Sequence, residues 1–99
     1  VTSMPLLSDI EIQRELGLLS GWTRKGSEIT RTFAFDGFPA ALAFAQSLVP
    51  IAEEMNHHPD LDIRYNRVVV RLSTHDRGGI TEKDVAQARL IEAAAPVSP

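Results

Sequence analysis

The chain is short, mildly acidic and free of cysteine, and each of these properties excludes some classes of protein. Its 99 residues leave room for one domain, residues 1–99, with a thin core that association between copies would help to stabilise. Apolar residues make up 43% of the chain and charged residues 23%, which is usual for a folded globular protein. The net charge of −3 comes with scattered basic residues, which argues against direct nucleic-acid binding.

The absence of cysteine excludes disulfides and thiolate metal sites, and it fits a reducing compartment. No stretch approaches the roughly 20 apolar residues that a membrane span needs. Residues 1–7 lack the basic start and apolar middle of a signal peptide. We therefore expect a cytoplasmic protein without membrane contact.

A capping box opens the first predicted helix, because the Ser8 hydroxyl and the Glu11 carboxylate can satisfy free amides at a helix start. Apolar residues then recur at helical spacing at Ile12, Leu16 and Leu19. Gly21 suits the left-handed position that often follows a helix. We predict a helix that ends at about residue 19.

A hairpin is predicted next, with strands at 22–24 and 29–35 and a turn at 25–27. One face of the second strand carries Ile29, Phe33 and Phe35, interrupted by Arg31. For Trp22 we favour packing in the core or hairpin over stacking on a ligand.

A central helix is expected from Phe38 to Met55. Pro39 fits its first turn, whereas Pro50 lies inside it and predicts a bend. The apolar stripe expected to face the core is Phe38, Leu42, Ala45, Val49, Ala52 and Met55.

Two further strands and a last helix complete the chain. Leu61, Ile63 and Tyr65 mark the third strand, and Asn66 tolerates the positive φ of a tight turn. Val68, Val70 and Leu72 share one face of the fourth strand, residues 68–74, so that His75 ends this strand facing away from them. Thr81 and Asp84 cap a helix that carries Val85, Ala88, Ile91 and Ala95 and ends at Pro96.

The predicted order is helix, strand, strand, helix, strand, strand, helix. It indicates an α+β fold in which a four-stranded antiparallel sheet carries the helices on one face, with a core spanning about residues 8–95.

A single predicted hairpin joins the two segments that carry the three histidines. His57 and His58 precede the third strand and His75 ends the fourth, so antiparallel pairing brings both segments to one edge of the sheet. Imidazole exchanges protons near neutral pH, so three converging rings favour acid–base catalysis. Each histidine alone would more often be a polar filler or a cap. Glu53 lies four residues before His57, one helical turn behind its ring.

The spacing resembles the signature of the pterin-4a-carbinolamine dehydratase family. The matching residues are Glu53, His57, His58, Pro59, Tyr65, His75 and Asp84. Further similar segments are Gly21-Trp22, Phe33-Ala34-Phe35, Tyr65-Asn66-Arg67-Val68, Ser73-Thr74-His75 and residues 79–84. Asn56 and Leu61 depart from the acidic and aromatic residues that many members carry, which bears on pocket polarity and stacking.

The resemblance implies an enzyme, 4a-hydroxytetrahydrobiopterin dehydratase, that recycles the pterin of aromatic amino-acid hydroxylases. It implies catalytic roles for His57 and His75, substrate binding by His58, and an orienting role for Glu53. The positions that match the pterin pocket are Asn56, His57, His58, Pro59, Ser73, Thr74, His75 and Asp76. It also implies a homodimer or homotetramer.

Two alternatives remain beside this enzyme. Three histidines plus Glu53 suffice in number for zinc, but adjacent His57 and His58 point in different directions, and the resemblance implies neither metal nor cofactor. Relatives of the family also serve as dimerisation cofactors for a homeodomain transcription activator or resemble assembly factors for a carbon-fixing enzyme. A non-catalytic role that binds a protein partner is therefore the second hypothesis, although the three histidines favour the enzyme.

Overall fold

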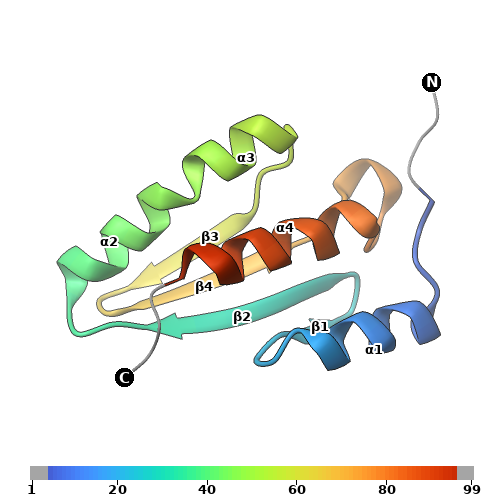
Figure 1. Cartoon of the computed structure of the whole chain (residues 1–99), viewed down its shortest axis with the longest axis horizontal. Coiled ribbons are helices and arrows are strands. Elements are labelled where there is room, and N and C mark those ends of the chain that lie inside the picture. Colours follow the sequence, from blue (N-terminus) through green and yellow to red (C-terminus); the bar gives the residue numbers. More distant parts are fainter. Residues whose placement is uncertain (1–4, 96–99) are drawn as a thin grey trace.

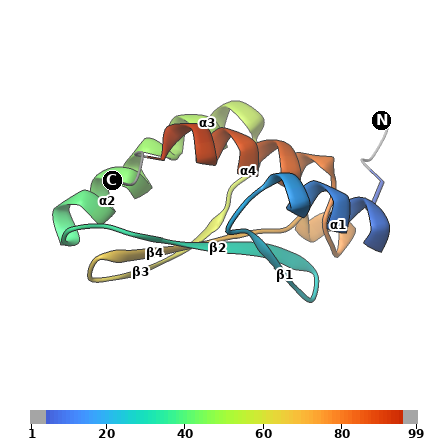
Figure 2. The ribbon, with the colours of Figure 1, turned by 60° about the horizontal axis from the view of Figure 1, so that its bottom comes forward.

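Four strands form one antiparallel sheet in the order β1-β2-β4-β3, and the helices pack on one of its faces (Figures 1 and 2). The structure is a computed structural model that describes residues 5–95. Its elements are α1 (Asp9–Leu18), β1 (Thr23–Lys25), β2 (Glu28–Ala34), α2 (Phe38–Ser47), α3 (Val49–Met55), β3 (Asp60–Arg64), β4 (Arg67–Leu72), the 3-10 helix η1 (His75–Arg77) and α4 (Glu82–Ala94). The predicted α+β fold with helices on one face is confirmed. The predicted end of the last helix at Pro96 lies outside the described residues.

The core lies between the sheet and the helices. Alternation along β4 buries Val68, Val70 and Leu72 completely, as the sequence predicted. Val85, Ala88 and Ile91 of α4 belong to the same buried cluster and cover this face of the sheet. Trp22 is also buried, and its indole N–H donates to Glu92 Oε1 at 2.7 Å, so its predicted packing role is confirmed.

Capping boxes start the first and last helices. Ser8 Oγ accepts from the Glu11 amide at 3.2 Å, and Glu11 Oε1 accepts from the Ser8 amide at 2.9 Å. The hydrogen bond from the Ser8 backbone holds the pKa of Glu11 below its usual value. Thr81 and Asp84 form the same arrangement before α4. Both caps confirm the predicted helix starts.

The central helix is interrupted. α2 ends at Ser47, Leu48 joins it to α3, and Pro50 occupies the first turn of α3, where its missing amide hydrogen breaks no helical bond. The prediction of a single bent helix was wrong, because Pro50 stands at the start of a second helix.

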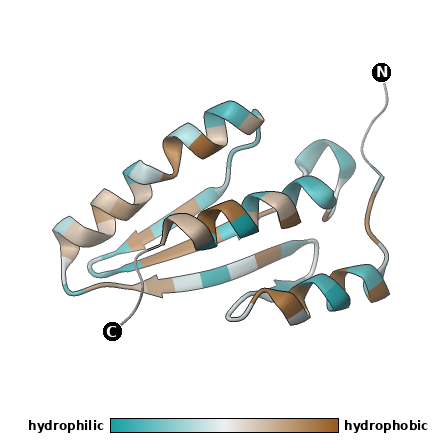
Figure 3. Ribbon diagram, viewed as in Figure 1, coloured by the Kyte–Doolittle hydropathy of each residue, from teal (hydrophilic) through white to brown (hydrophobic). Residues whose placement is uncertain are grey.

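The expected core stripe of this region was also partly wrong. The residues that are buried there are Ala41, Phe44, Ala45, Leu48 and Ala52. Phe38, Leu42 and Val49 are instead exposed by 44%, 42% and 54%. α2 is apolar around much of its circumference (Figure 3), and only one side can meet the sheet. Phe38 and Leu42 of α2 therefore remain uncovered within the described part of the chain, as does Val49 at the start of α3.

Two local expectations near the hairpin of β3 and β4 need correction. The positive φ of the turn falls on Tyr65, at 51°, rather than on Asn66. The Asn66 amide group instead donates to the carbonyl of Phe35 at 3.0 Å, which fixes its own conformation. His75 does not end a strand, because β4 stops at Leu72 and His75 begins η1. Within residues 5–95, no helix has both the length and the apolar character needed to cross a membrane.

Candidate active site

Each of the three histidines lies within 4 Å of a different carboxylate. His57 Nε2 is 2.6 Å from Asp84 Oδ1, His58 Nε2 is 2.6 Å from Glu53 Oε2, and His75 Nε2 is 3.6 Å from Asp60 Oδ2. The pairs differ strongly in exposure. Only the first is buried, and the other two face solvent.

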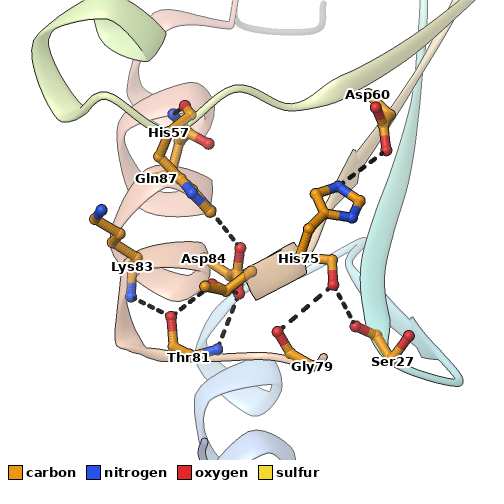
Figure 4. Close-up of polar contacts among 11 residues, drawn as sticks. Ser27, His57, Asp60, His75, Gly79, Thr81, Lys83, Asp84 and Gln87 are labelled. Carbon is orange, nitrogen blue, oxygen red and sulfur yellow. Dashed lines mark hydrogen bonds and ion pairs between the residues drawn. The ribbon is translucent and has the colours of Figure 1, made fainter. Parts of the chain in front are cut away.

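The end of α3 turns His57 inward. Asn56 caps this helix in the left-handed conformation, with φ of 49°, which Asn tolerates better than most residues. The His57 amide then donates to the carbonyl of Ala52 at 3.0 Å. This tight C-terminal turn directs the His57 ring toward α4 (Figure 4). The next residue, His58, remains on the surface.

Asp84 receives three hydrogen bonds in the interior. Besides its contact with His57, its Oδ2 accepts from the Thr74 hydroxyl at 2.8 Å and from the Thr81 amide at 2.9 Å. The hydroxyls of Thr74 and Thr81 are also 2.7 Å apart. The carboxylate is fully buried, so these donors replace the water that it has lost.

Gln87, one turn further along α4, fixes the backbone of His57. Its Nε2 donates to the His57 carbonyl at 2.5 Å. Its Oε1 is buried and has no hydrogen-bond partner among residues 5–95. The ring and the carbonyl of His57 are thus both anchored to α4.

The exposed pair of Glu53 and His58 borders an apolar cavity of about 200 Å³. The cavity lies between the central helices and β3, and it is lined by Ala45, Leu48, Val49, Ala52, Glu53, His58, Pro59 and Leu61. Glu53 was expected behind His57, but it pairs with His58 instead. The expectation was wrong because His57 lies beyond the left-handed Asn56 and has left the helical path.

The β3–β4 hairpin places the two histidine-bearing segments at the same end of the sheet. Asp60, the first residue of β3, pairs with Arg71 near the end of β4. His75 follows on η1, and its Nε2 approaches the Asp60 carboxylate at the start of β3 (Figure 4). The ring of His75 is 73% exposed, so a ligand can reach it.

The other residues expected in a ligand pocket do not all lie on one surface. Ser73 Oγ donates to the carbonyl of Ser27 at 2.8 Å, and the Thr74 hydroxyl points inward to Asp84. Asp76 is exposed on η1, and Pro59 lines the apolar cavity. Thr74 therefore holds Asp84, which in turn contacts the His57 ring.

The roles of Asp84, Asp60 and Gln87 beside the histidines were missed from the sequence. Asp84 was recognised as a helix cap and as part of the family signature, but neither pattern gives its contact with His57, 27 residues away. Two imidazoles at one sheet end, one buried on a carboxylate and one exposed, can accept and donate protons. Among residues 5–95 there is no group of three or more His, Asp or Glu side chains placed to hold a metal ion.

The fold and the site define a small α+β protein with histidine–carboxylate pairs at one end of an antiparallel sheet. Residues 5–94 match the model of the family described as Pterin 4 alpha carbinolamine dehydratase, and the chain belongs to this family. The predicted family is thereby confirmed.

Known proteins similar to this chain include both sequences and solved structures. A relative from Roseiflexus sp. (strain RS-1), provisionally named a pterin-4-alpha-carbinolamine dehydratase, is 50% identical over 86 residues, which cover 87% of this chain and 92% of the relative. The crystal structure of a transcriptional coactivator/pterin dehydratase from Brucella melitensis matches with a TM-score of 0.88 and 37% identity, over 93% of this chain and 100% of that one. A pterin dehydratase-like protein, described as a RuBisCO assembly factor in the alpha-carboxysome, shares the fold at 24% identity and a TM-score of 0.62, over 78% of this chain and 89% of that one.

Proposed function

We propose that this protein dehydrates 4a-hydroxytetrahydropterins, such as 4a-hydroxytetrahydrobiopterin, to quinonoid dihydropterin and water. The observation that carries the proposal is the pair of imidazoles at one sheet end, His57 held by buried Asp84 and His75 open to solvent, in a chain of the pterin dehydratase family. In this role the protein would return the oxidised pterin of an aromatic amino-acid hydroxylase to its recycling route.

The reaction needs two proton transfers and no change in electron count. The C4a–OH bond breaks, and the leaving oxygen takes a proton so that water departs. The N5–H bond also breaks, its proton goes to a base, and its electron pair forms the new C4a=N5 double bond. Each transfer assisted by a positioned side chain is typically worth about 10² to 10⁴ in rate.

His57 and His75 are the groups that we assign to these transfers. His57 has limited contact with solvent, and the adjacent Asp84 carboxylate, 2.6 Å from its Nε2, holds the ring in place for proton transfer. His75 is exposed and has only a long contact, 3.6 Å, to Asp60, which leaves its ring available to substrate.

His58 has a different assignment, because it borders the apolar cavity and pairs with Glu53 on the surface. We propose that His58 binds substrate and that Glu53 orients its ring. Asn56, Pro59, Ser73 and Asp76 are proposed to complete the pocket wall. Thr74 contributes indirectly, through Asp84.

The proposal is tested by stopped-flow measurement of 4a-hydroxytetrahydropterin dehydration with and without the protein. The expected result is a first-order formation of quinonoid dihydropterin whose rate rises in proportion to protein concentration. A rate equal to the uncatalysed rate at every protein concentration would refute the enzyme.

A protein-binding role is the second candidate, and one observation favours it. Phe38, Leu42 and Val49 expose apolar surface on α2 and α3 without cover from the described part of the chain. The Brucella melitensis structure is also described as a transcriptional coactivator. As the second candidate, we propose that this surface binds a protein partner in a dimerisation or assembly role. A second copy of this chain, in a homodimer or homotetramer, is one such partner, and that contact leaves the catalytic proposal intact. Histidine variants separate the two roles, because they should stop turnover while leaving assembly unchanged.

A further inference from the structure

We propose that Asp84 is a positioning residue that holds His57 with its ring proton on Nε2, so that Nδ1 is the nitrogen that exchanges a proton with substrate. The catalytic part of this inference rests on the proposed function. The position of the ring proton is a property of the folded chain and can be measured without any substrate.

The donors around Asp84 leave one of its oxygens for His57. Both donors on Oδ2, the Thr74 hydroxyl and the Thr81 amide, bring hydrogens, so this oxygen acts as an acceptor. Oδ1 remains for His57 Nε2 at 2.6 Å. An ionised carboxylate can only accept, so Nε2 must be the nitrogen that carries the hydrogen.

The surroundings of Asp84 favour its ionised form. Asp84 lies in the first turn of α4, where the free amides and the helix dipole favour an anion. Within residues 5–95 the ion pair recorded for Asp84 is the one with His57, and no lysine or arginine joins it. The carboxylate therefore stabilises the positive ring that forms when His57 accepts a second proton.

His57 is also held through its backbone, and its Nδ1 has no hydrogen-bond partner among the described residues. The His57 amide is bonded to the carbonyl of Ala52, and the His57 carbonyl is bonded to Gln87. The backbone on both sides of the ring is therefore fixed. None of the hydrogen bonds found among residues 5–95 uses Nδ1, so this nitrogen is free for a ligand.

Asp84 also links the two histidine-bearing segments. One carboxylate contacts the ring of His57 and the hydroxyl of Thr74, which directly precedes His75. A change at Asp84 should therefore disturb the geometry between the two imidazoles as well as the proton position on one of them.

The test is nitrogen-15 NMR of the full-length protein with labelled histidine, at alkaline pH where neutral rings prevail. Long-range proton–nitrogen correlations identify which ring nitrogen carries the hydrogen, and three histidines give three assignable rings. The expected result is the Nε2–H form for His57. An Nδ1–H form for His57 in the wild-type protein would overturn the inference, and this reading requires no variant that might unfold.

The Asp84→Asn variant sharpens the test. The donors from Thr74 and Thr81 should select the amide oxygen, which turns the Asn NH2 group toward His57. A donor in that place forces Nε2 to accept and shifts the hydrogen to Nδ1. We expect this shift together with a fall in kcat of about 10²-fold and a KM within about threefold of wild type.

Asp62→Asn is the matched control, because it makes the same chemical change on β3, where Asp62 pairs with Arg64 at the surface. It should leave the His57 proton position and kcat unchanged. A folded Asp84→Asn protein with wild-type kcat would overturn the positioning role. An Nε2–H ring in a protein that does not accelerate dehydration would overturn the proposed function and leave the position of the ring proton established.

Discussion

The Glu53 carboxylate lies 2.6 Å from His58 Nε2 at the surface, whereas the adjacent His57 contacts a carboxylate that is completely buried. Two consecutive histidines thus have the same type of partner in opposite environments. The exposed pair is screened by solvent and salt, so its strength should be small. The buried pair is protected from both. This difference predicts different effects on binding and turnover.

His58→Ala should raise KM about fivefold or more and change kcat by less than about threefold, because His58 borders the cavity and is assigned to binding. Steady-state dehydration kinetics measure both constants. Glu53→Gln should produce a smaller rise in KM, since it removes only the partner that orients the ring. A His58→Ala variant whose kcat falls as far as that of a His57 variant would contradict this division of roles.

His57→Ala should lower kcat by at least about tenfold and also destabilise the fold. The substitution leaves Asp84 buried without its imidazole partner, which costs about 1–3 kcal/mol. Thermal or urea unfolding measures the loss of stability and kinetics measure kcat. A variant with wild-type stability would show that the buried contact is not formed in solution.

His75→Ala should lower kcat by a similar factor without affecting stability. Its ring is 73% exposed and its contact to Asp60 is long, so little folding energy depends on it. The same unfolding experiment provides the comparison with His57→Ala. Unchanged turnover in His75→Ala would remove this residue from the proposed mechanism.

Dehydration should survive exhaustive chelation, because the two proton transfers require no Lewis acid. Elemental analysis of the purified protein should find no stoichiometric metal. One equivalent of zinc whose removal abolishes turnover, and whose return restores it, would overturn the acid–base mechanism in its present form.

The protein should sediment with at least twice the mass of one chain at micromolar concentration. The exposed Phe38, Leu42 and Val49 supply an apolar surface, and the edge strands β1 and β3 supply unpaired backbone. Leu42→Glu should reduce the assembly to a smaller species if α2 forms a contact. Leu18→Glu on α1 is the matched control, since Leu18 is even more exposed, at 76%, and lies outside that surface. A wild-type monomer with full activity would contradict the assembly proposal alone.

Local patterns in the sequence predicted much of the fold. Alternation at Val68, Val70 and Leu72 and the capping boxes at Ser8 and Thr81 depend on neighbours within a few residues, so they can be found by spacing. Antiparallel pairing of the third and fourth strands likewise placed the histidine-bearing segments correctly at one end of the sheet. These features depend little on how distant segments pack.

The rest depended on contacts that are distant in sequence. Pro50 is compatible with a bend or a new helix, and packing of α3 against its neighbours decides between them. The partner of His57 could not be found by spacing, because the left-handed Asn56 moves the ring away from Glu53 and toward Asp84 on α4. The side-chain amide of Asn66 donates to the carbonyl of Phe35, 31 residues away, and the positive φ of the turn falls on Tyr65.

The most direct test of the central claim compares stopped-flow dehydration of 4a-hydroxytetrahydropterin by the wild-type protein and by a His57→Ala, His75→Ala double variant at equal concentration. The folded state of the variant is checked by its far-UV circular dichroism. We expect strong acceleration by the wild type and a rate close to the uncatalysed one for the folded double variant. Equal acceleration by both proteins would contradict the assignment of catalysis to these histidines.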